Sequence, residues 1–227
     1  MDMRHMVRSC AAVFVAAVAQ QSLANDFDYQ YLSISATDIN IESDGRDVAE
    51  LNANTLTLSL DVSERAFLAL STSRIDADLS NGFEVDENEP ESDINRLFIG
   101  AHDQPDERTS LWMGVGVGRG NFETLSCATP VAGSCPTGQQ QTEKNDWSEA
   151  RFALGVRYWM LPQWLELATG IGYRRTRIED TQSDTLADIG LRFYPLNNST
   201  LSVSVDYAVE LQDGDEDRLD MELRWSF

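Results

Sequence analysis

Charged side chains of both signs recur at every second position in the last third of this sequence. Side chains two residues apart share one face of an extended strand, so these charges would meet partners on neighbouring strands. In a water-poor interior such partners form charge-assisted hydrogen bonds, although a solvated outer surface could carry the same mixture. The predicted network contains Arg151, Arg157, Glu166, Arg174, Asp188, Arg192, Asp206, Glu210, Arg218, Asp220, Glu222 and Arg224. The chemistry that it offers is mutual neutralisation of charge.

Two acidic segments carry the oxygen ligands that Ca²⁺ or Mg²⁺ prefers. Asp213, Asp215 and Asp217 have the initial spacing of a calcium-binding loop, but the central glycine and the closing glutamate of such a loop are missing. The other segment runs from residue 84 to residue 91 and holds five carboxylates. A solvated hairpin tip is the alternative for both, and we expect no cofactor.

Cysteine and histidine, which serve most zinc and nucleophilic sites, are scarce. Cys127 and Cys135 lie in a segment rich in Gly, Pro, Thr and Ser, and in an oxidising compartment we expect them to form a disulfide. A zinc site usually has four ligands, and no histidine lies near this pair. His102 is the only histidine beyond residue 24, and it lies beside Asp103 near a predicted short turn.

The charged residues lie on segments in which apolar and polar side chains alternate, a period of two that predicts strands. No segment beyond residue 24 has a convincing helical period. The alternation predicts ten strands, at 27–39, 55–62, 66–75, 95–102, 111–122, 150–160, 164–178, 186–195, 201–211 and 219–227. Short turns alternate with longer links, as in an antiparallel up-and-down barrel with both chain ends at the short-turn end.

The first 24 residues have the order of a secretory signal. Arg4 and Arg8 precede a ten-residue apolar run, which is followed by Ser22, Leu23 and Ala24. We therefore predict a cleaved signal peptide over residues 1–24 and a single barrel domain over residues 25–227. Cleavage leaves 15 basic and 37 acidic residues, and a chain this acidic repels nucleic acid.

Three features favour a membrane barrel over a soluble barrel, which would hide its apolar face. First, charges of both signs suit a narrow lumen. Second, Gly114, Gly116, Gly118 and Gly120 share one polar face and would leave room for arginine side chains from across that lumen. Third, aromatic residues gather near the short-turn ends like an interfacial girdle, namely Phe27, Tyr29, Tyr31, Phe67, Trp112, Tyr158, Trp159, Trp164, Phe193, Tyr194, Trp225 and Phe227.

The last nine residues, Leu219 to Phe227, alternate strictly and end on an aromatic residue. Together with the signal peptide and the alternating segments, this terminus resembles the small outer-membrane β-barrel superfamily of Gram-negative bacteria, typified by OmpA-type and OmpX-type domains. The resemblance implies an all-β, antiparallel, up-and-down transmembrane barrel in the outer membrane. Those relatives have eight strands, which is the alternative to ten. Trp225 and Phe227 would belong to the signal that the barrel-assembly machinery recognises.

The resemblance also implies outer-membrane lipid and lipopolysaccharide as partners, with divalent cations bridging the acidic external loops to lipopolysaccharide phosphates. We expect a non-enzymatic role in the structure or the surface interactions of the envelope. A narrow passive pore for small solutes or ions is the first alternative. An outer-membrane enzyme acting on lipid A or on protein is the second, but such enzymes hold their histidine at the outer rim or on the lipid side, and His102 is expected at the opposite end.

Overall fold

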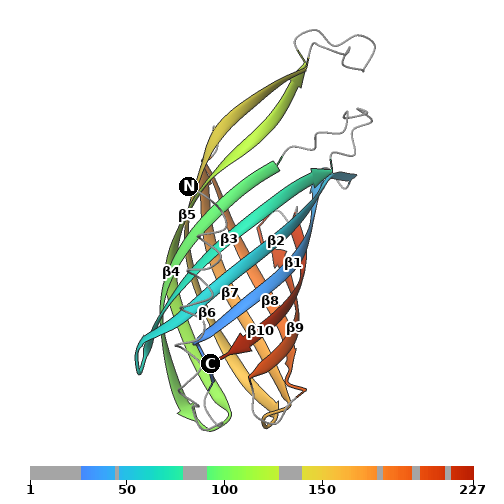
Figure 1. Cartoon of the computed structure of the whole chain (residues 1–227). Helices are drawn as coiled ribbons and strands as arrows, with labels where there is room; N and C mark the ends of the chain where they lie inside the picture. Colours follow the sequence, from blue (N-terminus) through green and yellow to red (C-terminus); the bar gives the residue numbers. More distant parts are fainter. Residues whose placement is uncertain are drawn as a thin grey trace, which may run out of the picture.

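Ten antiparallel strands close into one barrel, because each strand pairs with its neighbours in sequence and β1 also pairs with β10 (Figure 1). The computed structural model describes residues 27–43, 46–78, 91–127, 140–177, 181–195, 200–212 and 216–227. The strands are β1 (Tyr31–Ser43), β2 (Arg46–Ser63), β3 (Ala66–Asp78), β4 (Glu91–Asp106), β5 (Thr109–Cys127), β6 (Gln140–Leu161), β7 (Leu165–Arg177), β8 (Thr181–Phe193), β9 (Leu201–Glu210) and β10 (Glu216–Ser226). The prediction of ten strands is confirmed, and the alternative of eight is wrong.

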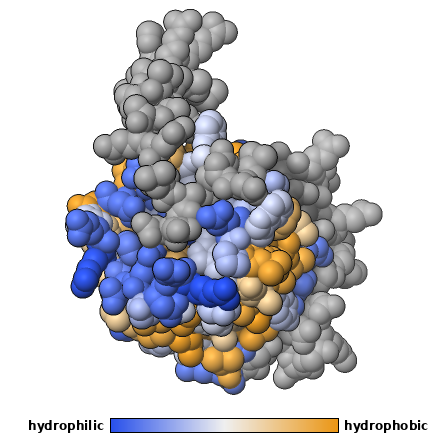
Figure 2. All heavy atoms as spheres, turned by 90° about the horizontal axis from the view of Figure 1, so that it is seen from below, coloured by the Kyte–Doolittle hydropathy of each residue, from blue (hydrophilic) through white to orange (hydrophobic). Residues whose placement is uncertain are grey.

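The outer wall of the barrel is apolar. On β5 the side chains of Leu111, Met113, Val115 and Val117 point outward and are 45–57% exposed. Seen from the short-turn end, hydrophilic residues gather over the end of the barrel and hydrophobic ones lie along its sides (Figure 2). Such a wall is favourable only where lipid replaces water, and a closed sheet leaves no edge strand unpaired in the bilayer. No helix among the described residues is long and apolar enough to cross a membrane.

The alternate glycines of β5 face inward, as predicted, but neighbouring strands fill the space that they leave. A Cβ atom on Gly116 would lie 2.9 Å from the Phe98 ring and 3.1 Å from Arg151 Nε. Phe98 belongs to β4 and Arg151 to β6, the two strands that pair with β5. The expectation that arginines reach these glycines from across the lumen is therefore wrong, because adjacent side chains already occupy the space.

Replacing Gly114 by alanine is expected to destabilise the barrel. The new Cβ would lie 2.4 Å from the Phe98 ring and 2.6 Å from the carbonyl oxygen of Ile99, and overpacking of this kind costs about 1–3 kcal/mol. Gly172→Ala is the matched control, because its Cβ would meet nothing closer than 3.4 Å. Urea unfolding in detergent would measure both variants, and equal stabilities would contradict the packing of β5 against Phe98.

Several strands extend further than the alternation predicts. The links expected at residues 40–54 and 123–146 are largely strand, since β2 begins at Arg46, β5 ends at Cys127 and β6 begins at Gln140. The β5–β6 hairpin reaches well beyond the other strands at the end opposite the C-terminus (Figure 1). Backbone pairing continues there without an apolar face, so the sequence pattern that marks a strand in lipid is absent. Conversely, residues 27–30 were predicted as strand but precede β1.

Candidate functional site: the closed base of the lumen

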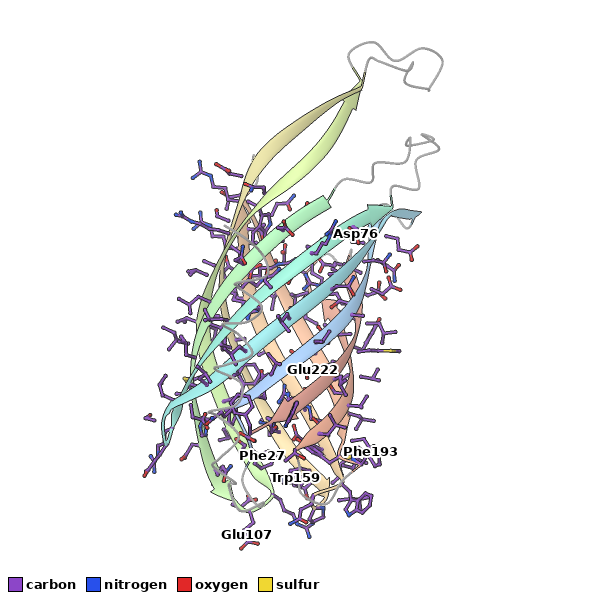
Figure 3. All side chains as sticks on the ribbon, in the orientation of Figure 1. Phe27, Asp76, Glu107, Trp159, Phe193 and Glu222 are labelled. Carbon is purple, nitrogen blue, oxygen red and sulfur yellow. The ribbon has the colours of Figure 1, made fainter. Side chains whose placement is uncertain are left out.

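Half of the aromatic residues expected in the girdle point into the barrel. Phe27, Tyr29, Phe67, Trp159 and Tyr194 are buried and, with Phe98, form one hydrophobic cluster, against which Trp112 packs. Tyr158, Trp164, Phe193 and Trp225 are exposed on the outer wall. Phe27 and Trp159 lie within the lower end of the barrel, whereas Phe193 points away from it (Figure 3). The prediction of one lipid-facing girdle is thus wrong for the inward set, because strand-end aromatics are shared between the two faces.

Residues 27–30, which we call the N-terminal plug, fill the short-turn end of the lumen. The Phe27 ring stacks on Trp159 with a centroid separation of 5.4 Å, and the Tyr29 ring stacks on Phe67 at 4.8 Å. The Tyr29 hydroxyl forms a hydrogen bond of 3.0 Å with Ser110 Oγ. The plug is thereby held by both faces of its two aromatic rings and by a buried polar contact.

Backbone and carboxylate contacts fix the rest of the plug. The backbone N–H of Phe227 donates to the carbonyl oxygen of Gln30 at 3.2 Å, which ties the plug to the C-terminus. Asp28 accepts a hydrogen bond from the backbone N–H of Gln30 at 2.8 Å. Burial raises the pKa of the Asp28 carboxyl above its usual value, which reflects how little water reaches this segment.

Glu166 on β7 lies directly beneath the plug and is the most buried charged residue of the base. Its side chain is 0% exposed, and it accepts hydrogen bonds from Arg157 Nε at 2.6 Å and Arg157 Nη2 at 2.9 Å. Arg192 Nη1 donates to it at 3.2 Å, and the Tyr194 hydroxyl donates at 2.8 Å. Burial raises the pKa of Tyr194, with a further contribution from the Glu166 charge, so the hydroxyl keeps its proton. Four charge-assisted donors therefore satisfy one buried carboxylate.

Arg157 joins the ion pairs to the plug. Its guanidinium lies 5.1 Å from the Phe27 ring centroid and 5.0 Å from that of Tyr29. Nη1 of the same arginine donates to the carbonyl oxygen of Asp28 at 3.2 Å. Arg192 extends the network to Glu222 at 2.9 Å, and Glu222 pairs with Arg224 at 3.1 Å. The base is thus one continuous arrangement of ion pairs and aromatic rings that spans β6, β7, β8 and β10.

A second group of ion pairs lies farther along the strands. Arg174 contacts Asp184 at 2.6 Å and Glu216 at 2.8 Å, and Glu216 also pairs with Arg218. Arg96 on β4 lies 3.6 Å from Glu149 on β6. Sequence reasoning missed Asp184, Glu216, Arg96 and Glu149, although all four follow the inward parity of their strands. Arg96 and Glu149 were missed because their strands were predicted too short or too weakly alternating.

The remaining predicted network residues do not join these chains of ion pairs. The carboxylate of Asp206 lies where a Cβ on Gly190 would be, and that of Asp188 lies against Gly170. Asp220 accepts a hydrogen bond from the Thr37 hydroxyl. Arg151 lies 4.8 Å from the Phe98 ring centroid, and Glu210 is the last residue of β9, in register with Leu186. The predicted network is therefore divided between separate positions on the inner wall.

A cavity of about 550 Å³ remains in the lumen beyond the base. Arginines and carboxylates line it from different strands, among them Arg96, Arg151, Asp206 and Asp220, together with Ser71. The lumen is therefore filled at the short-turn end and hollow farther along. No group of three or more His, Cys, Asp or Glu residues suited to a metal ion occurs in the described part of the chain.

Some predicted sites lie outside the described residues. Cys135, the Cys127 side chain, Asp213 and Asp215 belong to these parts, as do residues 84–90 and the signal peptide. Asp217 is described, and it pairs in register with Val209 on β9. The disulfide, the divalent-cation loops and the cleavage after residue 24 stay predictions.

An apolar outer wall around a polar, ion-paired interior defines a transmembrane β-barrel. The chain belongs to the outer membrane protein beta-barrel domain family, whose model matches residues 9–208. The protein is accordingly located in the outer membrane of a Gram-negative bacterium, with its short turns and both described chain ends on the periplasmic side.

Solved structures show the same fold at low sequence identity. The β domain of the Bordetella autotransporter BrkA is 15% identical with a TM-score of 0.53, over 89% of this chain and 100% of that one. The translocator domain of NalP from Neisseria meningitidis is 10% identical (TM-score 0.49, 99% and 96% covered). Neisserial surface protein A is 9% identical (TM-score 0.42, 87% and 96% covered). No curated protein matches the chain.

Proposed function

We propose that this protein is a non-enzymatic outer-membrane barrel, closed at its periplasmic end, that serves envelope integrity or interaction at the cell surface. The observation that carries this proposal is the packed base, where the N-terminal plug and the Glu166 ion pairs occupy the lumen together. A lumen blocked in this way supports a structural or recognition role better than a passage for solutes. The β5–β6 hairpin, which projects beyond the barrel (Figure 1), offers a surface for recognition on the external side.

A narrow pore is the second candidate function, and the cavity of about 550 Å³ favours it. A barrel of about ten strands encloses a lumen little wider than one that side chains fill. Passage would need the plug and the ion pairs beneath it to move aside. We therefore place the pore second.

An enzymatic role has little support among the described residues. His102 stacks on Tyr29 with ring centroids 4.2 Å apart, and its Nε2 atom is buried without a hydrogen-bond partner in the described part of the chain. A general base needs access to substrate and a hydrogen bond that orients it. His102 instead packs as a ring within the base of the lumen.

Single-channel recording in planar bilayers tests the closed barrel. The refolded protein is expected to insert without producing stable conductance steps, because the base obstructs ion flow. Heat-modifiable migration on gels would first establish that the sample is folded. Long-lived, sizeable steps from the unmodified protein would favour the pore and overturn the proposed role.

A further inference from the structure

The apolar outer wall ends at a single register row of polar residues, which we call the rim row. Thr72 of β3 pairs with Asn95 of β4, Asn95 with Arg119 of β5, Arg119 with Ser148 of β6, and Ser148 with Arg177 of β7. These side chains share the outward parity of the lipid-facing residues. The next outward residues toward the periplasm on β3, β4 and β5 are Leu70, Leu97 and Val117, so the rim row marks the external boundary of the hydrocarbon layer.

The arginines of this region are exposed and uncompensated. Arg119 and Arg177, and also Arg175 two positions nearer the periplasm on β7, are exposed. Within the described part of the chain, no carboxylate lies within ion-pair distance of any of the three. The whole chain has a net charge of −21 with only 17 basic residues. Three unpaired arginines on one outward patch therefore create a local positive potential on an acidic protein.

A groove of about 610 Å³ runs from the apolar wall to the rim row. Leu70, Leu97 and Val117 line its lower part, and Asn95, Arg119 and Ser148 line its polar end. One position farther out, Asp93 of β4 and Asp146 of β6 both pair with Asn121 of β5. The outward surface thus changes from apolar to basic to acidic, and an anion would be held at the depth of the arginines alone.

The geometry points to a binding site for a phosphorylated glycolipid of the outer leaflet. Its phosphate lies between Arg119 and Arg177, beside the Ser148 hydroxyl, and one acyl chain lies along the groove. Two strand spacings separate the arginine backbones by about 10 Å, which both long side chains can bridge to one phosphate group. Guanidinium groups bind phosphate through paired hydrogen bonds, so the ligand needs both its phosphate and its chain. The site does not depend on whether the lumen conducts.

Titration of the refolded full barrel with bisphosphorylated lipid A, followed by native mass spectrometry, tests this site. Each lost charge-assisted contact is worth about tenfold in affinity, so the Arg119→Gln/Arg177→Gln variant is expected to bind at least about tenfold more weakly. Arg65→Gln/Arg108→Gln removes the same charge from exposed residues at the periplasmic turns. This control is expected to bind like the unmodified protein.

Three further ligands identify what is recognised. Dephosphorylated lipid A is expected to bind as weakly to the unmodified protein as lipid A does to the rim variant. Inorganic phosphate alone is expected not to compete, and Leu97→Trp, which fills the groove, is expected to weaken lipid A binding. Equal affinity of the rim variant and the turn control would overturn the site, and so would competition by inorganic phosphate at the concentrations of lipid A. Equal binding of phosphatidylglycerol would overturn its assignment to a glycolipid.

Discussion

Replacing Glu166 by glutamine is expected to lower the free energy of unfolding by about 3–5 kcal/mol, because it leaves two buried guanidiniums without a counter-charge. Arg157 and Arg192 both pair with this carboxylate, and their side chains are only 6% and 8% exposed. Glutamine preserves the shape of the side chain, so the loss reports on charge and not on a cavity. Urea titration of the refolded barrel in detergent, followed by tryptophan fluorescence, would measure it.

Glu107→Gln is the control for this prediction. Glu107 is exposed at the tip of the periplasmic turn between β4 and β5 (Figure 3), and surface substitutions of this kind stay within about 0.5 kcal/mol. A Glu166→Gln barrel as stable as the Glu107→Gln barrel would show that the buried ion pairs do not hold the base together.

Replacing both Phe27 and Tyr29 by alanine is expected to open the periplasmic end of the lumen. The two rings make the stacking contacts with Trp159, Phe67 and His102 that hold the plug. Without them the strands and the ion pairs of the wall remain, so the barrel still forms. Planar-bilayer recording is expected to change from silence to discrete conductance steps.

The control for this gain of conductance removes two aromatic rings from the outer wall instead. Trp164 and Phe193 pack together with ring centroids 6.2 Å apart, and both are exposed to the membrane interface. Trp164→Ala/Phe193→Ala is expected to stay silent. Conductance in this control, or silence in the Phe27→Ala/Tyr29→Ala barrel, would show that the plug does not seal the lumen.

The fold could be predicted from sequence because each lipid-crossing strand must show lipid one face and the lumen the other. Leu201 to Leu211 displays this requirement directly, and its pattern assigns every side chain to a face. The same parity placed Arg157, Glu166, Arg192, Glu222 and Arg224 on the inner wall. Beyond the bilayer the requirement lapses, which is why the outer parts of β2, β5 and β6 were taken for links.

The composition of the base could not be predicted in the same way. Phe27 and Tyr29 alternate with polar neighbours like a strand, and nothing local distinguishes a paired strand from a segment folded into the lumen. Likewise, aromatic residues near a strand end are compatible with lipid or with the lumen. The choice between Trp159 inside and Trp164 outside follows from strand register, which depends on partners far away in sequence.

Access to the inner wall from the periplasmic side tests the closed base most directly. Ser71 lines the cavity beyond the aromatic cluster, and Ser71→Cys can be introduced after Cys127 and Cys135 are changed to serine. A small, membrane-impermeant thiol reagent applied to the periplasmic face of oriented proteoliposomes is expected to leave this cysteine unmodified. The same reagent should modify it when Phe27 and Tyr29 are also alanine. Rapid modification with the plug intact would contradict a lumen sealed at its base.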